Sequence, residues 1–79
     1  MSIELEMEEF HEVDSSMIKA VGIRDHFLVV FFTDSSVYRY PDCAELLSDL
    51  VSADSVGKFF HREIRNQLCE KLRDDIWPE

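Results

Sequence analysis

The fold is decided by residues 27–40, which read FLVVFFTDSSVYRY. The first six of these residues are aromatic, β-branched or leucine, and a short run of this composition favours a strand over a helix. Polar residues 33–36 form a loop, and residues 37–40 return antiparallel until Pro41, which has no backbone N–H, ends the ladder. The stretch therefore predicts a β-hairpin whose first strand is central in a sheet.

Upstream of the hairpin, residues 17–23 predict a further strand, which the tight connection at residues 24–26 joins to the hairpin. Gly22, near the end of this strand, indicates a bulge or a close backbone approach. Residues 1–12 alternate apolar residues with acids, and two interpretations remain open for them: a fourth strand at the sheet edge, or an acidic flexible arm. The first 40 residues thus predict a three-stranded antiparallel meander, with or without a fourth strand.

Downstream of the hairpin the pattern predicts two helices. Asp42 and Glu45 have the spacing of a capping box, and apolar residues recur on one helical face as far as Val51. Asp54 or Ser55 caps the second helix, which runs to about Arg73. Strands followed by helices indicate an α+β fold in which both helices pack on one face of the antiparallel sheet.

The chain has 79 residues and a net charge of −9, so we expect one acidic domain that repels phosphate unless its cations gather on one face. Its only basic region is residues 55–73, with five Lys or Arg against two Glu. The longest apolar run, residues 27–32, is too short to cross a bilayer. The acidic N-terminus is unlike a secretory signal, so we expect a cytoplasmic protein with no membrane partner and with reduced Cys43 and Cys69.

No pattern typical of an active site or a metal site is found in the sequence. Neither a nucleophile elbow nor a phosphate-binding loop singles out any hydroxyl or carboxylate. His11, His26 and His61 lie on separate predicted elements, without the spacing of zinc ligands. Cys43 is interpreted as a small buried apolar residue. We therefore expect no enzyme, no metal, no cofactor and no small-molecule substrate.

Short motifs are spread over every predicted element: Ser15-Ser16, Ile18 and Gly22, Leu28-x-Val30-x-Phe32, Tyr38-Arg39-Tyr40, Ser55-x-Gly57-Lys58-Phe59-Phe60 and Ile64-Arg65. Together they resemble the KTSC domain, a small module found alone in bacterial proteins and at the C-terminus of some lysyl-tRNA synthetases. The resemblance covers residues 13–65 of a single domain, residues 1–79, and leaves residues 1–12 as an acidic N-terminal arm and residues 66–79 as a C-terminal helical extension. The family's function is unknown, and its attachment to the synthetases implies RNA binding. The resemblance also marks motif residues to which we assign a structural role: Ser15, Ser16, Tyr38, Tyr40, Gly57 and Phe60.

The chain departs from the family pattern in two places besides its longer C-terminus. Family members carry glycine in the hairpin loop, where this chain has Ser35-Ser36, so the turn is expected to be strained or of another type. Pro41-Asp42-Cys43 stands where the family usually has a Val-Pro pair. A partner could be distinguished at residues 41–43 or at the extension formed by residues 66–79.

The length of the hairpin loop decides which face of the sheet carries Tyr38 and Tyr40, because a slip of one residue moves every side chain to the other face. A loop of residues 34–35 sets the tyrosines beside Phe31 and Val29, and a loop of residues 34–36 sets them beside Phe32 and Val30. We favour the second loop because it gathers the tyrosines with the apolar residues under the helices. The tyrosines are then interpreted as core residues with hydroxyls at the edge.

This register leaves Phe27, Val29 and Phe31 on the outer face of the sheet as a candidate interface, because soluble monomers seldom expose large apolar areas. Two alternatives remain open for what covers them. One is the N-terminal arm, through the apolar residues Ile3, Leu5, Met7 and Phe10. The other is a second copy of the chain, as in a homodimer.

Lys58, Arg62 and Arg65 recur at spacings of four and three and so share a helical face. With Arg39 of the hairpin they form the candidate nucleic-acid-binding set, in which cations hold phosphates and an exposed aromatic ring stacks on bases. The simpler interpretation is a solvated face carrying the weak ion pairs Asp54–Lys58 and Glu70–Arg73.

Two functional hypotheses follow from the sequence. The first is a small binding module that contacts RNA through the last helix and the hairpin. The second is a protein-interaction or homodimerisation module that uses the apolar outer face of the sheet.

Overall fold

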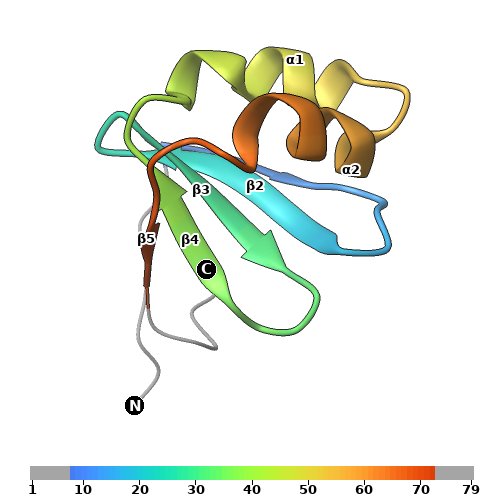
Figure 1. Cartoon of the computed structure of the whole chain (residues 1–79), viewed down its shortest axis with the longest axis horizontal. Coiled ribbons are helices and arrows are strands. Elements are labelled where there is room, and N and C mark those ends of the chain that lie inside the picture. The colour runs from blue at the N-terminus through green and yellow to red at the C-terminus, as the bar shows by residue number, and fades with distance from the viewer. Residues whose placement is uncertain (1–7, 73–79) are drawn as a thin grey trace.

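The computed structural model describes residues 8–72 and shows one antiparallel sheet with a helical layer on one face (Figure 1). The strands are β1 (Glu9–Glu12), β2 (Ile18–Arg24), β3 (Phe27–Phe32), β4 (Val37–Tyr40) and β5 (Glu70–Lys71). They lie in the order β1-β2-β3-β4-β5, and every neighbouring pair is antiparallel. The helical segments are η1 (Ala44–Leu46), α1 (Leu47–Ser52), α2 (Val56–Phe59) and η2 (Phe60–Ile64). The predicted α+β architecture is confirmed, and none of the described helices is long and apolar enough to span a membrane.

A two-residue turn, Asp25-His26, joins β2 to β3, and both residues have positive φ, 51° and 68°. Two positive φ values in succession give the turn a twist that matches that of the flanking strands. The register of β2 on β3 therefore runs regularly from Arg24 opposite Phe27 back to Ala20 opposite Phe31. The irregularity expected near Gly22 lies instead between Ile18 and Ala20, so Lys19 is the bulged residue.

The hairpin loop is Thr33-Asp34-Ser35, one residue earlier than predicted, because the N–H of Phe32 donates to the carbonyl of Ser36 at 2.9 Å. Tyr38 lies opposite Val30 and Tyr40 opposite Leu28, rather than opposite Phe32 and Val30. This correction shifts the pairing by two residues and so leaves each side chain on its predicted face. Ser35 has φ 75°, in the region where glycine is favoured.

The first helix does not begin with the predicted capping box. Residues 44–46 form a single 3₁₀ turn, preceded by Cys43, whose side chain makes no capping bond, and regular α-helix starts only at Leu47. The chain reverses directly after Pro41, where the N–H of Cys43 donates to the carbonyl of Tyr40 at 3.4 Å. This backbone turn replaces the cap that Asp42 and Glu45 were expected to supply.

The second helix starts where predicted, with Ser55 as its cap: Ser55 Oγ accepts the N–H of Lys58 at 3.3 Å. It passes into the wider turn η2, closed by a bond of 2.9 Å from the N–H of Arg65 to the carbonyl of Phe60. The helix then ends, so the prediction of helix to about Arg73 is wrong.

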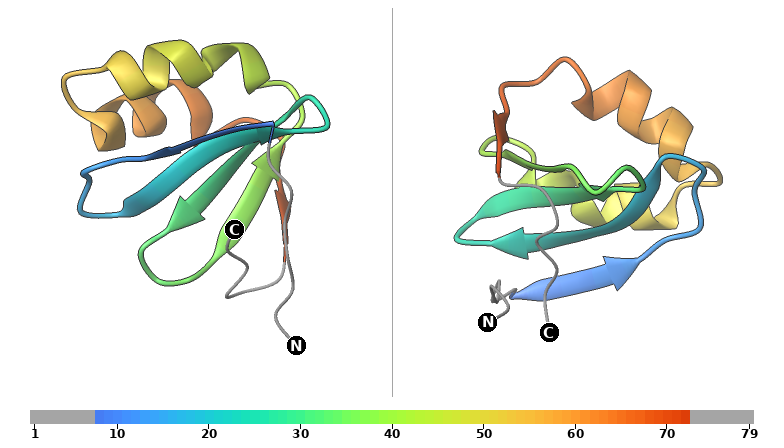
Figure 2. Two further views of the ribbon diagram at one scale, coloured as in Figure 1. Left: turned by 180° about the vertical axis from the view of Figure 1, so that it is seen from behind. Right: turned by 90° about the horizontal axis from the view of Figure 1, so that it is seen from below.

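Residues 66–72 are not the helical extension that the sequence indicated. The chain becomes extended and adds β5 to the open edge of β4, with Glu70 opposite Arg39 and the N–H of Leu72 donating to the carbonyl of Val37 at 2.7 Å. Figure 2 shows β5 beside β4, at the opposite edge of the sheet from β1. An edge strand carries unpaired backbone groups, and β5 pairs those of β4.

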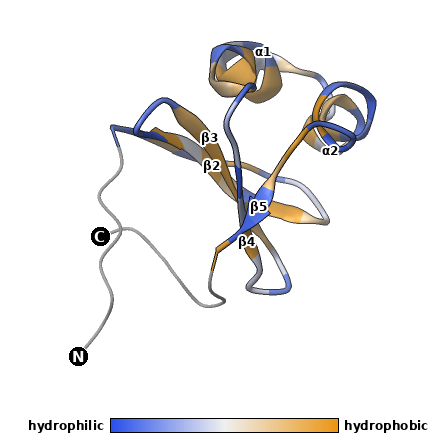
Figure 3. Cartoon of the chain, turned by 60° about the vertical axis from the view of Figure 1, so that its left-hand side comes forward, coloured by the Kyte–Doolittle hydropathy of each residue, from blue (hydrophilic) through white to orange (hydrophobic). Residues whose placement is uncertain are grey.

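Apolar side chains pack on both faces of the sheet. The main core lies between the sheet and the helices, where Figure 3 shows hydrophobic residues on facing elements. Its buried members are Ile18, Val21, Leu28, Val30, Tyr40, Cys43, Leu47, Leu50, Phe60 and Ile64. A smaller core on the outer face buries Ala20, Val29, Phe31 and Val37, with Phe10 and Leu72 packed against them.

The smaller outer core shows that most of the candidate interface, Phe27, Val29 and Phe31, is covered within the chain. The ring of Phe10 on β1 meets that of Phe31 edge-on, with 5.7 Å between centroids, and Val29 and Phe31 are 2% and 1% exposed. Phe10 of the N-terminal strand β1, together with Leu72, thus covers Val29 and Phe31, while Phe27 stays half-buried. Ile3, Leu5 and Met7 lie outside the described residues.

Candidate functional site

The basic residues of the second helix lie together on its solvent side. Phe60 and Ile64 are buried against the sheet, so Lys58, Arg62 and Arg65 face away from it and are exposed. We call these three residues the basic helix face. Its position follows from helical spacing, because two buried anchors four residues apart turn the residues between and around them outward.

The guanidinium groups of the basic helix face have partners within the helix. The Arg62 guanidinium lies over the Phe59 ring, 5.4 Å from its centroid, and its Nε donates to Glu63 at 2.9 Å. Arg65 Nη1 lies 3.1 Å from His61 Nδ1. Exposed ion pairs such as Arg62–Glu63 contribute little to stability, so a phosphate could compete for the guanidinium. Within residues 8–72, the ammonium of Lys58 makes no ion pair, and the predicted pair with Asp54 is not formed.

An open hollow of about 560 Å³ lies between the end of α1 and the start of α2, beside the basic helix face. Lys58, Phe59 and Arg62 line one part of it. Asp49 and Asp54 line another part. A polyanion could therefore contact the outer surface of the helix, but the two carboxylates oppose its entry into the hollow.

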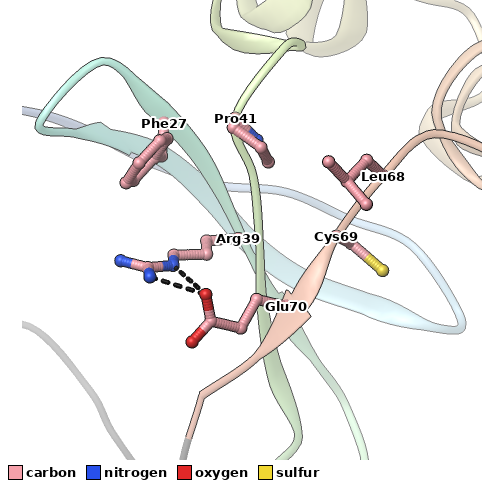
Figure 4. Close-up of a pocket in the computed structure, with 6 residues that line it drawn as sticks. All are labelled: Phe27, Arg39, Pro41, Leu68, Cys69 and Glu70. Carbon is pink, nitrogen blue, oxygen red and sulfur yellow. Dashed lines mark hydrogen bonds and ion pairs between the residues drawn. The ribbon is translucent and has the colours of Figure 1, made fainter.

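Arg39 does not join the other three predicted cations. It lies opposite Val29 and so on the outer face of the sheet, away from the helices. Its Nη2 and Nε both donate to Glu70 Oε2, at 2.6 and 3.1 Å, and its guanidinium lies 4.8 Å from the Phe27 ring centroid (Figure 4). Glu70 thus pairs across the sheet with Arg39. The predicted pair Glu70–Arg73 involves Arg73, which lies outside the described residues. A single surface made of the last helix and the hairpin is not what the structure shows.

Two of the motif residues with an expected structural role meet at the start of the second helix. Ser15 Oγ accepts the N–H groups of Met17 and Ile18 at 3.3 and 3.4 Å, which fixes the entry to β2. The same oxygen lies 3.5 Å from the position that a Cβ of Gly57 would occupy. A Cβ at this position would be in ordinary van der Waals contact with Ser15, so the first turn of α2 packs against the entrance of the sheet without requiring glycine.

The other motif residues lie in the same region of the molecule. Phe60 packs edge-on against Phe32 and Tyr40, at centroid distances of 5.5 and 5.9 Å, and Phe32 packs in the same way against Tyr38. The carbonyl of Ser16 accepts the hydroxyl of Thr33 at 3.3 Å. The ring contacts hold the helical layer on the sheet, and the bond to Thr33 ties the hairpin loop to the entry of β2.

Both cysteine thiols are free, and burial sets the chemistry of the first. Cys43 is 1% exposed, and this burial, with the charge of Asp42 nearby, raises its thiol pKa. Burial also raises the pKa of the Tyr40 phenol well above its usual value, and Cys69 beside its hydroxyl adds to the effect. Neither group is a reactive nucleophile, and the described part of the chain holds no group of three metal-ligating side chains.

One surface feature had no signal in the sequence. A hollow of about 340 Å³ lies where β4 ends, lined by Phe27, Arg39, Pro41, Leu68, Cys69 and Glu70 (Figure 4). Leu68 was predicted to lie in the apolar stripe of the last helix, and the structure leaves it 70% exposed at this hollow. The hollow depends on the pairing of β5 with β4, and no local pattern indicates that pairing.

These features define a small α+β domain with helices on one face of a meandering antiparallel sheet, a type of scaffold that can carry a binding surface. The family model of the KTSC domain matches residues 14–67, more than half of the chain, and the chain belongs to this family. The matched range differs from the one inferred from the motifs, residues 13–65, by one residue at the start and two at the end. A search of curated proteins finds no match.

Proposed function

We propose that this KTSC domain is a binding module rather than an enzyme, and that it contacts RNA through the basic helix face alone. The observation that carries the proposal is the separation of charge in a chain of net charge −9. Lys58, Arg62 and Arg65 are all exposed along one helical segment that carries a single acid, Glu63, whereas the other acids lie elsewhere along the chain. A local cluster of cations can hold phosphates even where the whole protein is acidic.

The side chains suggest how such a contact would form. The ammonium of Lys58, which has no ion pair with any residue in 8–72, and the guanidinium groups of Arg62 and Arg65 would each meet a phosphate. The Arg62 guanidinium, stacked on Phe59, presents a flat surface on which an unpaired base can stack. Arg39, which the sequence placed in the same set, has no part in this surface because Glu70 holds it on the outer face.

The binding should be weak and depend strongly on salt. Three phosphate contacts to a single strand correspond to a slope of about −2 in a plot of log K against log salt. The measurement is fluorescence anisotropy with labelled single-stranded and hairpin RNAs over a salt series. In the double variant Lys58→Glu, Arg65→Glu we expect binding to be lost.

A matched control changes the net charge equally at another place. Lys19 and Arg24 are exposed on β2, so Lys19→Glu with Arg24→Glu adds the same negative charge on a different surface. This control should retain most of the affinity, because long-range repulsion alone is screened at physiological salt. Equal losses in both double variants, or no binding by the unaltered chain to any of the RNAs, would remove the proposal.

The second sequence hypothesis, self-association through the outer face of the sheet, has less support. Its central residues, Val29 and Phe31, are already covered within the chain by Phe10 and Leu72. Of the three residues predicted at this interface, Phe27 remains half-exposed, under the Arg39 guanidinium. A face this well covered offers little apolar area to a second copy.

A further inference from the structure

We infer that the hollow at the end of β4 is a docking site for an apolar side chain on a basic segment of a partner protein. The hollow is formed by three parts of the chain that are distant in sequence. Phe27 comes from β3, Arg39 and Pro41 from the end of β4, and Leu68 and Glu70 from the segment that forms β5 (Figure 4). It lies outside the basic helix face and is independent of the proposed RNA contact.

The hollow has a physical origin in the backbone. Arg39 pairs with Glu70, so in this register the next equivalent pair along the two strands would join Pro41 to Leu68. Proline has no N–H to donate, so the ladder stops and the two strands separate at this point. Side chains, rather than backbone hydrogen bonds, then line the space between them.

The lining is mostly apolar and is partly rigid. The Phe27 ring, the Pro41 ring and the Leu68 side chain surround the space, and the aliphatic stem of Arg39 adds to it. Leu68 is the one large hydrophobic side chain left exposed among residues 8–72. A space of about 340 Å³ accepts one leucine, methionine or phenylalanine side chain, which would also remove Leu68 from water.

The polar groups at the hollow favour a basic segment around that side chain. Both bonds from Arg39 go to Oε2 of Glu70, so the cation is neutralised and held in place on the Phe27 ring. The other carboxylate oxygen, Oε1, has no bond to any described residue, and the Glu70 side chain is 62% exposed. A lysine or arginine next to the apolar anchor can donate to this oxygen.

The charge of the whole chain favours the same occupant. At −9 it attracts a cationic segment and repels a second copy of itself. It also repels nucleic acid at a site where Arg39, the cation among the lining residues, is already paired. The occupant that fits both the lining and the charge is therefore a protein segment with an apolar residue beside lysine or arginine.

The test uses the full chain, labelled with nitrogen-15, and three short synthetic peptides. The first is rich in lysine with one central leucine, the second replaces that leucine by alanine, and the third replaces the lysines by glutamate. With the first peptide we expect amide shift changes centred on Phe27, Arg39, Leu68 and Glu70. Either of the other two peptides should bind about tenfold more weakly, because each lacks one half of the recognition.

Two variants distinguish binding in the hollow from a general attraction between the acidic chain and a basic peptide. Leu68→Asn removes the apolar rim without changing charge and should weaken the leucine peptide about tenfold, whereas Asn66→Ala, two residues away, should leave it unchanged. RNA binding should survive Leu68→Asn, so the two proposals can fail separately. Shift changes centred elsewhere, equal binding of the leucine and alanine peptides, or self-association of the chain through Leu68 would each overturn the inference.

Discussion

Replacement of Phe60 by alanine should nearly unfold this protein, whereas the same change at its neighbour Phe59 should be tolerated. Phe60 is 3% exposed and is the aromatic residue that joins the helical layer to the sheet, in edge-on contact with both Phe32 and Tyr40. Phe59 is half-buried, and its ring carries the Arg62 guanidinium. The two residues have the same chemistry and differ in what they touch.

The magnitude follows from the packing. Removing a buried phenylalanine side chain costs about 3–5 kcal/mol. A 79-residue domain has a total stability of about 4–12 kcal/mol at the usual value per residue. Phe60→Ala should therefore lower the free energy of unfolding by a large fraction of its total. The milder Phe60→Leu should lower it by about 1 kcal/mol.

The assay is urea unfolding followed by far-ultraviolet circular dichroism, on Phe60→Leu, Phe32→Leu and the double variant. The coupling energy between the two positions should be about 0.5–1.5 kcal/mol, which is the usual contribution of an edge-on aromatic pair. Phe59→Leu is the matched control and should show no coupling to Phe32. A Phe60→Ala variant that loses less than about 1 kcal/mol would refute the role assigned to this ring.

Two further predictions concern the hairpin and the buried phenol. Ser35→Gly should raise the free energy of unfolding by about 0.5–1 kcal/mol, because φ 75° is unfavourable for serine and not for glycine, and Ser36→Gly in the same thermal melts should not. The pKa of Tyr40 is raised by burial, so the folded state keeps its proton longer than the unfolded state and stability falls as pH rises above 10. Urea titrations across that range should show this decline, and it should be reduced in Tyr40→Phe; a decline of the same size in both chains would count against it.

Residues 27–40 contained enough information for the hairpin and for its faces. The composition of residues 27–32 favoured a strand wherever it packed, and the alternation along residues 37–40 set Tyr38 and Tyr40 on one side. The loop itself was placed one residue too late, because Ser35 adopts a positive φ that residue preference does not favour. The resulting error in the strand pairing was two residues, so each side chain was still assigned to the correct face of the sheet.

The helical segments were only partly predictable. Ser55 caps the second helix as expected, since capping depends on residues a few positions apart. The capping box at Asp42 has the right spacing but is not used, because the chain turns immediately after Pro41 to bring Cys43 and Leu47 onto the sheet. The apolar stripe to Arg73 was a false indication, because the apolar spacing continues past the point where the helix ends.

The α+β class, the central strands and the exposure of Lys58, Arg62 and Arg65 could be predicted from the sequence, because they depend on composition and on spacing within single elements. The family was indicated by a resemblance in motifs spread along the chain. The three-dimensional structure was needed to show that β5 pairs with β4, that Phe10 covers Phe31, and that Arg39 is held by Glu70 on the face opposite the helices. Arg39 and Glu70 are 31 residues apart, and backbone pairing at a sheet edge requires no particular side chains. The hollow beside Leu68 depends on that same pairing, so it too became visible only in the fold.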